Sequence, residues 1–277
     1  MIGVGRLGKT LLSSYFALLV LFLYAPLVVL VVFAFNSGTI PSLPIKSFST
    51  KWFSAAFSDT TLTSALARSA LIAAINGLAA TLLGTMAAVS LARKRLPLRG
   101  VVVTLLLLPL VVPYIVLAVG LVVLLHAFGI TTSLAAVLAG HVVLSLPYSA
   151  LVILPRLRTL DESIVEAASD LGASELKAFV LVTLPLLTPA LFSSFLIAFT
   201  ISFDEFAIAS FLAPPGNPTY PVLLYASSRT PALLPEVIAI GSVVIALSIV
   251  IIVGAEVVRR WAERRIEATV HPTPLAG

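Results

Sequence analysis

EAASDLGASELKAFVLVTLP, residues 166–185, is the stretch that decides the fold of this chain. It carries charged and small side chains, whereas apolar runs of about 20 residues or more, long enough to cross a bilayer, lie on both sides of it. A polar segment held between membrane spans is typical of a docking surface for a soluble partner. We therefore interpret residues 155–184 as a polar loop and expect the rest of the chain to be the membrane device that this loop drives.

The composition sets the class of protein. Of the 277 residues, 60% are hydrophobic and only 10% are charged, and the mean hydropathy is +1.14. About 25% of the residues of a soluble domain are charged, so these values predict a polytopic membrane protein. The apolar runs lack the alternation of barrel strands, so the predicted fold class is all-α. The chain has no cysteine, which excludes a disulfide framework and a thiolate metal site.

The apolar runs predict six transmembrane helices. They lie at residues 11–35, 63–92, 101–125, 132–154, 185–212 and 237–258. We treat residues 1–277 as a single transmembrane domain, and we expect the first span to be uncleaved because its apolar run is longer than that of a signal peptide. Pro109 and Pro113 interrupt the third span. Residues 36–61 form an external loop, where Trp52 lies in an expected interfacial helix, as a membrane anchor or as a substrate contact.

The distribution of positive charge predicts the orientation. With six spans both termini lie on one side, and that side carries 13 of the 17 lysines and arginines. They are Arg6, Lys9, Arg93, Lys94, Arg95, Arg99, Arg156, Arg158, Lys177, Arg259, Arg260, Arg264 and Arg265. The positive-inside rule therefore places both termini and the polar loop in the cytoplasm. We assign the net charge of +5 to this asymmetry and expect contact with membrane lipid and not with nucleic acid.

The polar loop reads as helix, turn, helix. Asp161 is a candidate N-cap, and an apolar stripe at helical spacing follows it. Gly172 stops or bends this helix, and residues 173–175 start another that leads into the fifth span at Pro185. The spacing Glu166-Ala167-Ala168, three residues, Gly172, nine residues, Val182, one residue, Leu184-Pro185 resembles the EAA signature of permease subunits of ATP-binding-cassette importers.

This resemblance implies a type I importer permease in a bacterial inner membrane. The loop would be the coupling helix that fits a groove on a cytoplasmic ATPase, through Glu166, Ala167, Ala168, Asp170, Leu171 and Gly172. The family also implies a second permease subunit, a dimer of ATPase subunits and an extracytoplasmic substrate-binding protein as partners. ATP and Mg²⁺ would bind to the ATPase, so we expect no cofactor, no metal and no catalytic residue in this chain. From the sequence alone, the second permease is either a different chain or a copy of this one.

Two adjacent acids within the fifth span indicate a specific role, because a charge at the bilayer centre costs about 2.5–3.5 kcal/mol on insertion scales. Asp204 and Glu205 form either an anionic site for a cationic substrate or a structural pair bonded to helix termini or to the partner permease. Ser202-Phe203-Asp204-Glu205 resembles the second permease of spermidine/putrescine importers, which implies a substrate pathway through Ser202, Asp204, Glu205 and Trp52. That group often has an acid where this chain has Tyr114, which instead offers an aromatic ring to an ammonium group.

Other functions remain as alternatives. Permeases for phosphonates, amino acids and opines share much of this pattern. A proton-coupled secondary transporter would use Asp204 and Glu205 as a relay but leaves the cytoplasmic signature unexplained and predicts internal repeats that the sequence does not show clearly. An intramembrane hydrolase lacks a nucleophile and base at recognisable positions. The histidines, His126, His141 and His271, show no ligand spacing, and we interpret them as structural.

Overall fold

Helices form almost all of the regular structure in this computed structural model, which describes residues 6–45, 47–92, 96–230, 233–250 and 253. The long helices are α1 (Arg6–Ala34), α3 (Thr60–Ala92), α4 (Arg99–Val111), α5 (Tyr114–Ala127), α6 (Leu134–Arg158) and α9 (Leu184–Phe203). The short elements are α2 (Lys51–Ser58), α7 (Glu162–Asp170), α8 (Glu175–Ala178), the π-helical turn η1 (Phe179–Thr183), α10 (Ala207–Leu212) and α11 (Tyr220–Ser228). A further apolar helix covers Leu234–Val250. The predicted all-α class is confirmed.

The chain separates into two units, residues 1–60 with 227–277, and residues 61–226. In the first unit, the segment after α1 folds back so that Asn36 and Phe48 form an antiparallel bridge. The ring of Phe53 in α2 lies 4.9 Å from that of Phe35. The Trp52 indole Nε1–H donates to the Asn36 carbonyl at 2.9 Å. The short helix predicted around Trp52 is therefore present as α2, tied to the end of α1.

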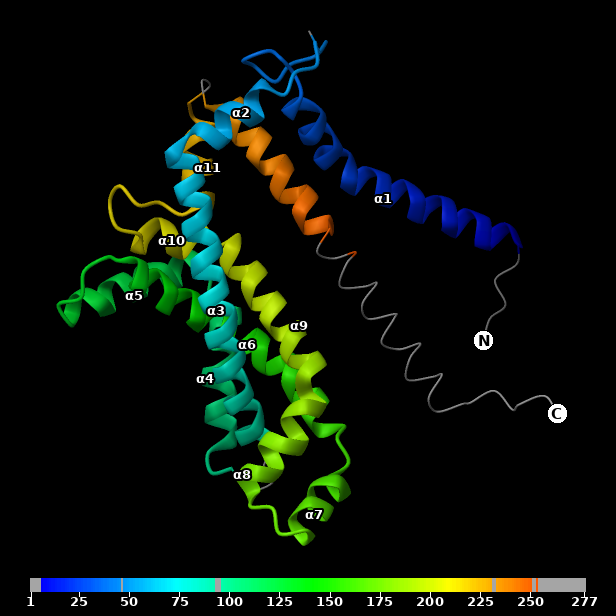
Figure 1. The fold of residues 1–277 in the computed structure, drawn as a ribbon, viewed down its shortest axis with the longest axis vertical. Helices are drawn as coiled ribbons and strands as arrows, with labels where there is room; N and C mark the ends of the chain where they lie inside the picture. The colour runs from blue at the N-terminus through cyan, green and yellow to red at the C-terminus, as the bar shows by residue number, and fades with distance from the viewer. Residues whose placement is uncertain (1–5, 46, 93–95, 231–232, 251–252, 254–277) are drawn as a thin grey trace. The chain divides into compact units, whose positions relative to one another are not determined.

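Small and polar residues hold the second unit together. Figure 1 shows α3, α6 and α9 running beside one another, with α7 and α8 at one end of this bundle. The Asn76 side-chain amide on α3 is fully buried and donates to Ser145 Oγ on α6 and to the Ala198 carbonyl on α9, each at 2.9 Å. Gly84 of α3 lies so close to Ser149 of α6 that an added Cβ would meet the Ser149 Cβ at 2.5 Å. Such close approach is how helices associate in lipid.

The predicted third span is two helices. α4 and α5 meet at an angle of 112° with a break at Val112 and Pro113. Val112 has extended backbone angles, φ −75° and ψ 128°, because the ring of a following proline disfavours the helical conformation. The kinked helix predicted over residues 101–125 is thus a sharp turn, and the interruption lies at Pro113 while Pro109 stays inside α4.

The predicted fifth span is also broken. A continuous helical stretch starts at Glu175, well before the predicted residue 185, and ends at Phe203. Its π-helical turn ends at Thr183, two residues before Pro185, so the carbonyl four residues before the proline, which its ring would crowd in an α-helix, belongs to this widened turn. Residues 204–206 are non-helical, and α10 then begins at Ala207. The predicted fifth span, residues 185–212, is therefore not one continuous helix, and the break falls at the two acids.

Four helices in the described part of the chain are long and apolar enough to cross a membrane. They are Gly8–Ala34, Thr60–Ala92, Leu134–Arg158 and Glu175–Phe203, and the bent α4–α5 pair makes a fifth if it counts as one span. The predicted sixth span, residues 237–258, lies partly outside the described residues; its described part is helical up to Val250. The segment between the predicted fifth and sixth spans contains α11.

Candidate functional site

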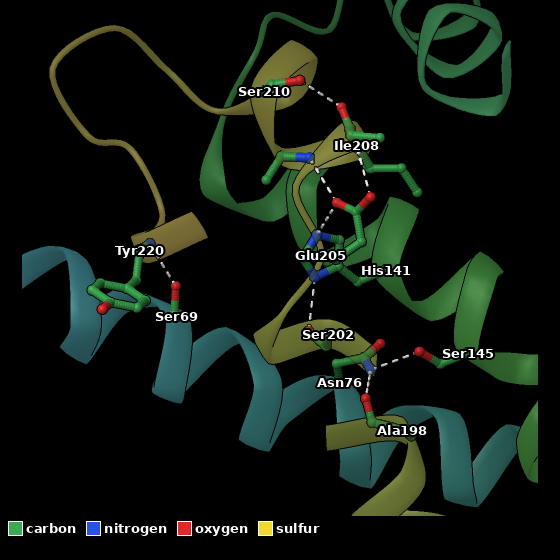
Figure 2. Close-up of polar contacts among 12 residues, drawn as sticks. Ser69, Asn76, His141, Ser145, Ala198, Ser202, Glu205, Ile208, Ser210 and Tyr220 are labelled. Carbon is green, nitrogen blue, oxygen red and sulfur yellow. Dashed lines mark hydrogen bonds and ion pairs between the residues drawn. The ribbon is translucent and has the colours of Figure 1, made fainter. Parts of the chain in front are cut away.

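The carboxylate of Glu205 caps the short helix α10. Its Oε1 accepts from the backbone N–H of Ile208 at 2.9 Å, and its Oε2 accepts from that of Ala209 at 3.0 Å. These N–H groups belong to the first turn of α10, and N–H groups in the first turn of a helix have no carbonyl acceptor within that helix. Figure 2 shows the carboxylate aimed at this helix end, with His141 on its other side. Only 5% of Glu205 is exposed, so this acid is built into the fold.

A histidine connects Glu205 to helix α6. His141 lies on α6 and is 1% exposed. Its Nε2 lies 3.3 Å from Glu205 Oε2, within ion-pair distance though not aligned as a hydrogen bond, and its Nδ1 lies 2.7 Å from Ser202 Oγ. The chain Ser202–His141–Glu205 has the residue types of a hydrolytic triad, but Ser202 is buried and Glu205 is engaged with α10. The arrangement therefore holds α6, α9 and α10 together.

Asp204 is placed differently from its neighbour. Its side chain is exposed, and no described residue hydrogen-bonds to or pairs with its carboxylate. It lines a cavity of about 460 Å³, within the range of small-ligand sites. The other lining residues are Tyr114, Thr200, Ile201, Glu205, Phe206 and Ala207. The break in the fifth span thus separates the two acids: the Glu205 carboxylate is buried against α10, and the Asp204 carboxylate is exposed at the cavity.

Aromatic rings border the same cavity. Tyr114 begins α5 directly after the Pro113 break, is 39% exposed, and has its hydroxyl 3.3 Å from that of Tyr148 on α6. The Phe206 ring lies 4.8 Å from that of Tyr225. Since α5 packs against α10, the breaks in the third and fifth spans meet at one place. A carboxylate beside aromatic faces is a chemistry suited to an organic cation.

The structure brings together three of the five residues predicted for a substrate pathway. Tyr114, Asp204 and Glu205 line the cavity. Ser202 lies behind it, 3% exposed and bonded to His141. Trp52 belongs to the other unit, where it is half-buried with Lys51 Nζ 4.4 Å from its ring centroid.

The predicted coupling segment is α7 and the turn that follows. Asp161 Oδ1 accepts from the Ser163 backbone N–H at 3.0 Å, which begins the helix as predicted and holds the pKa of the Asp161 carboxyl below its ordinary value. Gly172 ends it with φ +86°, while its N–H donates to Ser169 O and the Ala173 N–H to Ala168 O. This pair of bonds is a Schellman motif, which requires the left-handed conformation that glycine adopts without strain.

Most of the surface of α7 is uncovered in this chain. Leu171 is 90% exposed and Ile164 is 46% exposed, so the apolar stripe that the sequence shows is not buried inside the fold of this chain. Glu166 lines a second cavity, of about 1250 Å³, which α3, α7, α8 and α9 border. Exposed apolar side chains on a short, well-capped helix are typical of a surface that a partner covers.

Sequence reasoning missed the pairing of His141 with Glu205 and the role of Asn76. A histidine or asparagine inside a membrane span is a signal by itself, because polar groups there need a partner. The structural role predicted for His141 consists of its contacts with Ser202 and Glu205, which spacing along the sequence does not reveal. His126 is exposed and bonds to the Val122 carbonyl of its own helix, and His271 lies outside the described residues.

Comparison with known proteins gives a consistent result. Residues 80–268 match the family described as binding-protein-dependent transport system inner membrane component. The chain is 38% identical over 253 residues to the putrescine transport system permease protein PotI of Escherichia coli K12, covering 88% of this chain and 89% of that protein. It is 34% identical over 239 residues to the spermidine/putrescine transport system permease protein PotC of Haemophilus influenzae, covering 86% and 92%.

Solved structures show the same fold. A chain of a bacterial ABC transporter involved in the import of alginate superposes with a TM-score of 0.71 at 17% identity, over 92% of this chain and 95% of that one. The family describes transport subunits of the inner membrane, and the ATPase of such systems is a separate subunit. The chain therefore belongs to the inner membrane components of binding-protein-dependent transport systems, as a permease subunit of an ATP-binding-cassette importer and not as an enzyme.

Proposed function

We propose that this permease carries polyamines such as putrescine and spermidine. The observation that carries the proposal is the exposed Asp204 carboxylate, which faces a cavity and has no cation beside it among the described residues. The relatives named for putrescine and spermidine/putrescine transport support the same substrate class. An uncompensated acid at membrane depth is costly, and a passing ammonium group would offset that cost only while substrate is present.

The cavity offers separate contacts for the two parts of a polyamine. The Asp204 carboxylate would accept hydrogen bonds from an ammonium group, which are among the stronger polar contacts in proteins. The Tyr114 ring would attract a cation through its face, and Phe206 and Ile201 would contact the methylene chain. Glu205 would add negative potential from behind without binding the substrate itself, since both of its oxygens already accept backbone N–H groups.

The remaining parts of the proposal concern assembly and orientation. Six spans with both termini in the cytoplasm, as the charge distribution predicts, would place α7 on the cytoplasmic side. There α7, with Glu166, Ala167, Ala168, Asp170, Leu171 and Gly172, would dock into a dimeric ATPase that binds ATP and Mg²⁺. A second permease subunit would complete the pathway, and an extracytoplasmic binding protein would deliver the substrate. Closure of the ATPase dimer would then move α7 and the fifth span nearly as a rigid body.

Uptake of labelled putrescine and spermidine by cells carrying the complete transporter tests the proposal. Asp204→Asn should lower uptake at subsaturating substrate by about tenfold, the effect of losing about 1.4 kcal/mol of attraction at a partly solvated site. Asp204→Glu, which keeps the charge, is the matched control and should retain most of the uptake. Absence of polyamine uptake by a wild-type complex that assembles and hydrolyses ATP would reject the substrate and direct attention to other small organic solutes.

A further inference from the structure

The geometry points to His141 as a positioning residue for the substrate site: through Glu205 and Ser202 it fixes the turn that presents Asp204 to the cavity. This inference rests on the proposed function only for its transport readout. The contact residues of His141 lie on both sides of Asp204 in the sequence: Ser202 is two positions before it and Glu205 is directly after it. Its Nδ1 lies 2.7 Å from Ser202 Oγ and its Nε2 lies 3.3 Å from Glu205 Oε2. One imidazole from α6 therefore contacts both sides of the turn, as Figure 2 shows.

The backbone of this turn has little support of its own. The Asp204 N–H donates to Thr200 O at 3.2 Å, and the Glu205 N–H donates to Ser202 O at a long 3.4 Å. Asp204 has φ −94° and ψ 1°, which is outside the regular helix. Its side chain contributes no hydrogen bond within the described part of the chain. The direction of the Asp204 carboxylate is thus set by what holds Ser202 and Glu205 on either side of it.

The helix that carries His141 is itself well placed to act as a fixed support. Gly140, the residue before it, lies against α10 so closely that an added Cβ would be 2.6 Å from Ile208 Cγ2. Ser145, one turn further along α6, accepts from the Asn76 amide. α6 therefore contacts α3 on one side and α10 on the other, and His141 is buried between them at 1% exposure. Movement of the imidazole relative to the turn is restricted.

The residue type matters because the ring has a nitrogen on each side. Asparagine is too short to reach from the Ser202 side to the Glu205 carboxylate, whereas the longer glutamine amide reaches toward the position of Nε2 and can donate to Glu205. We therefore expect His141→Asn to release the turn and His141→Gln to retain part of the constraint. His126→Asn is the matched control, because His126 is exposed and contacts only its own helix through Val122 O.

The chain has no cysteine, so a cysteine introduced at position 204 is the only one it contains. A nitroxide spin label on Asp204→Cys, in the complete transporter in lipid nanodiscs, reports the mobility of the turn without any substrate. We expect higher label mobility with His141→Asn than with His126→Asn, and an intermediate value with His141→Gln. Equal mobility in the three backgrounds overturns the inference.

Transport supplies the second readout, measured in chains that carry neither the cysteine substitution nor the spin label. His141→Asn should lower putrescine uptake at subsaturating concentration by about tenfold, which corresponds to losing about 1.4 kcal/mol, the scale of one polar contact. In an Asp204→Asn background the same change should cost less than about twofold, because a residue that acts through Asp204 has nothing left to position. An equal loss in both backgrounds, or failure of both His141 variants to assemble with the ATPase, identifies a folding role and overturns the inference. If the wild type carries no putrescine, the proposed substrate fails while the spin label still decides the role of His141.

Discussion

Replacing Glu205 with glutamine should destabilise the permease, although the change is one of the smallest possible. Glu205 places two carboxylate oxygens on two N–H groups of α10, at 2.9 and 3.0 Å, and faces His141 Nε2 at 3.3 Å. Glutamine keeps one acceptor and turns an amide N–H₂ toward the second backbone N–H. Hydrogen bonds to charged groups contribute about 1.5–3 kcal/mol, and a buried donor left without an acceptor costs a similar amount. The expected loss is therefore about 2–4 kcal/mol.

The measurement is the thermal stability of the assembled transporter. For a folding unit of 150–250 residues each kcal/mol corresponds to about 2–4 °C in Tm, so Glu205→Gln should lower Tm by about 5–15 °C. The purified complex is heated in detergent, and the fraction that remains monodisperse is followed by size-exclusion chromatography. The control is Asp204→Asn, the same chemical change at the next residue. Its side chain is exposed and unbonded, so its Tm should stay within about 2 °C of the wild type.

The pair of variants makes the reasoning refutable. The two acids are adjacent in the sequence, so any account based on local composition predicts similar effects for both. A Tm loss with Asp204→Asn as large as that with Glu205→Gln would show that the break is not organised as described. An unchanged Tm with Glu205→Gln would show that the carboxylate does not cap α10.

Two further outcomes follow from glycines. Gly172 has φ +86°, and a Cβ added there would have open space around it. Asparagine tolerates this conformation, so Gly172→Asn should keep α7 and its coupling, whereas Gly172→Val should strain the turn and raise the ATPase activity that is not accompanied by uptake. Equal uncoupling by both variants would assign the effect to contact with the ATPase. Gly84→Ala should cost about 1–3 kcal/mol because its Cβ would meet Ser149 Cβ at 2.5 Å, while Gly120→Ala, with nothing within 4 Å, should be neutral or slightly stabilising in the same thermal assay.

Much of the helical layout was accessible from the sequence because membrane spans follow from length and hydropathy alone. The caps of α7 were accessible as well, since Asp161 and Gly172 act on groups one to four residues away. The breaks at Val112 and Asp204 were harder. Proline marked the first, but a proline in an apolar run is compatible with a mild kink or with the 112° turn that occurs here. The long-range packing of α5 on α10 decides between them.

The separation of the two acids could not be predicted from their neighbours. It depends on His141, which is 64 positions before Glu205, and on the N-terminus of α10, which exists only because the span breaks. The sequence offered two interpretations of the acidic pair, a substrate site or bonds to helix termini. The structure puts Glu205 at a helix terminus, as the second interpretation expects, while Asp204 lies at the cavity, where the substrate site remains a proposal.

The same separation bears on how solute preference changes during evolution. A residue that both shapes the fold and selects the solute is hard to replace, since any change in selectivity is lost to misfolding. Here the folding task rests on Glu205 and its buried partner, and Asp204 makes no side-chain bond within the described chain. If Asp204 binds the solute as proposed, single substitutions at position 204 would alter the charge presented to the solute while the permease still assembles, and new cargoes would be within reach of one mutational step.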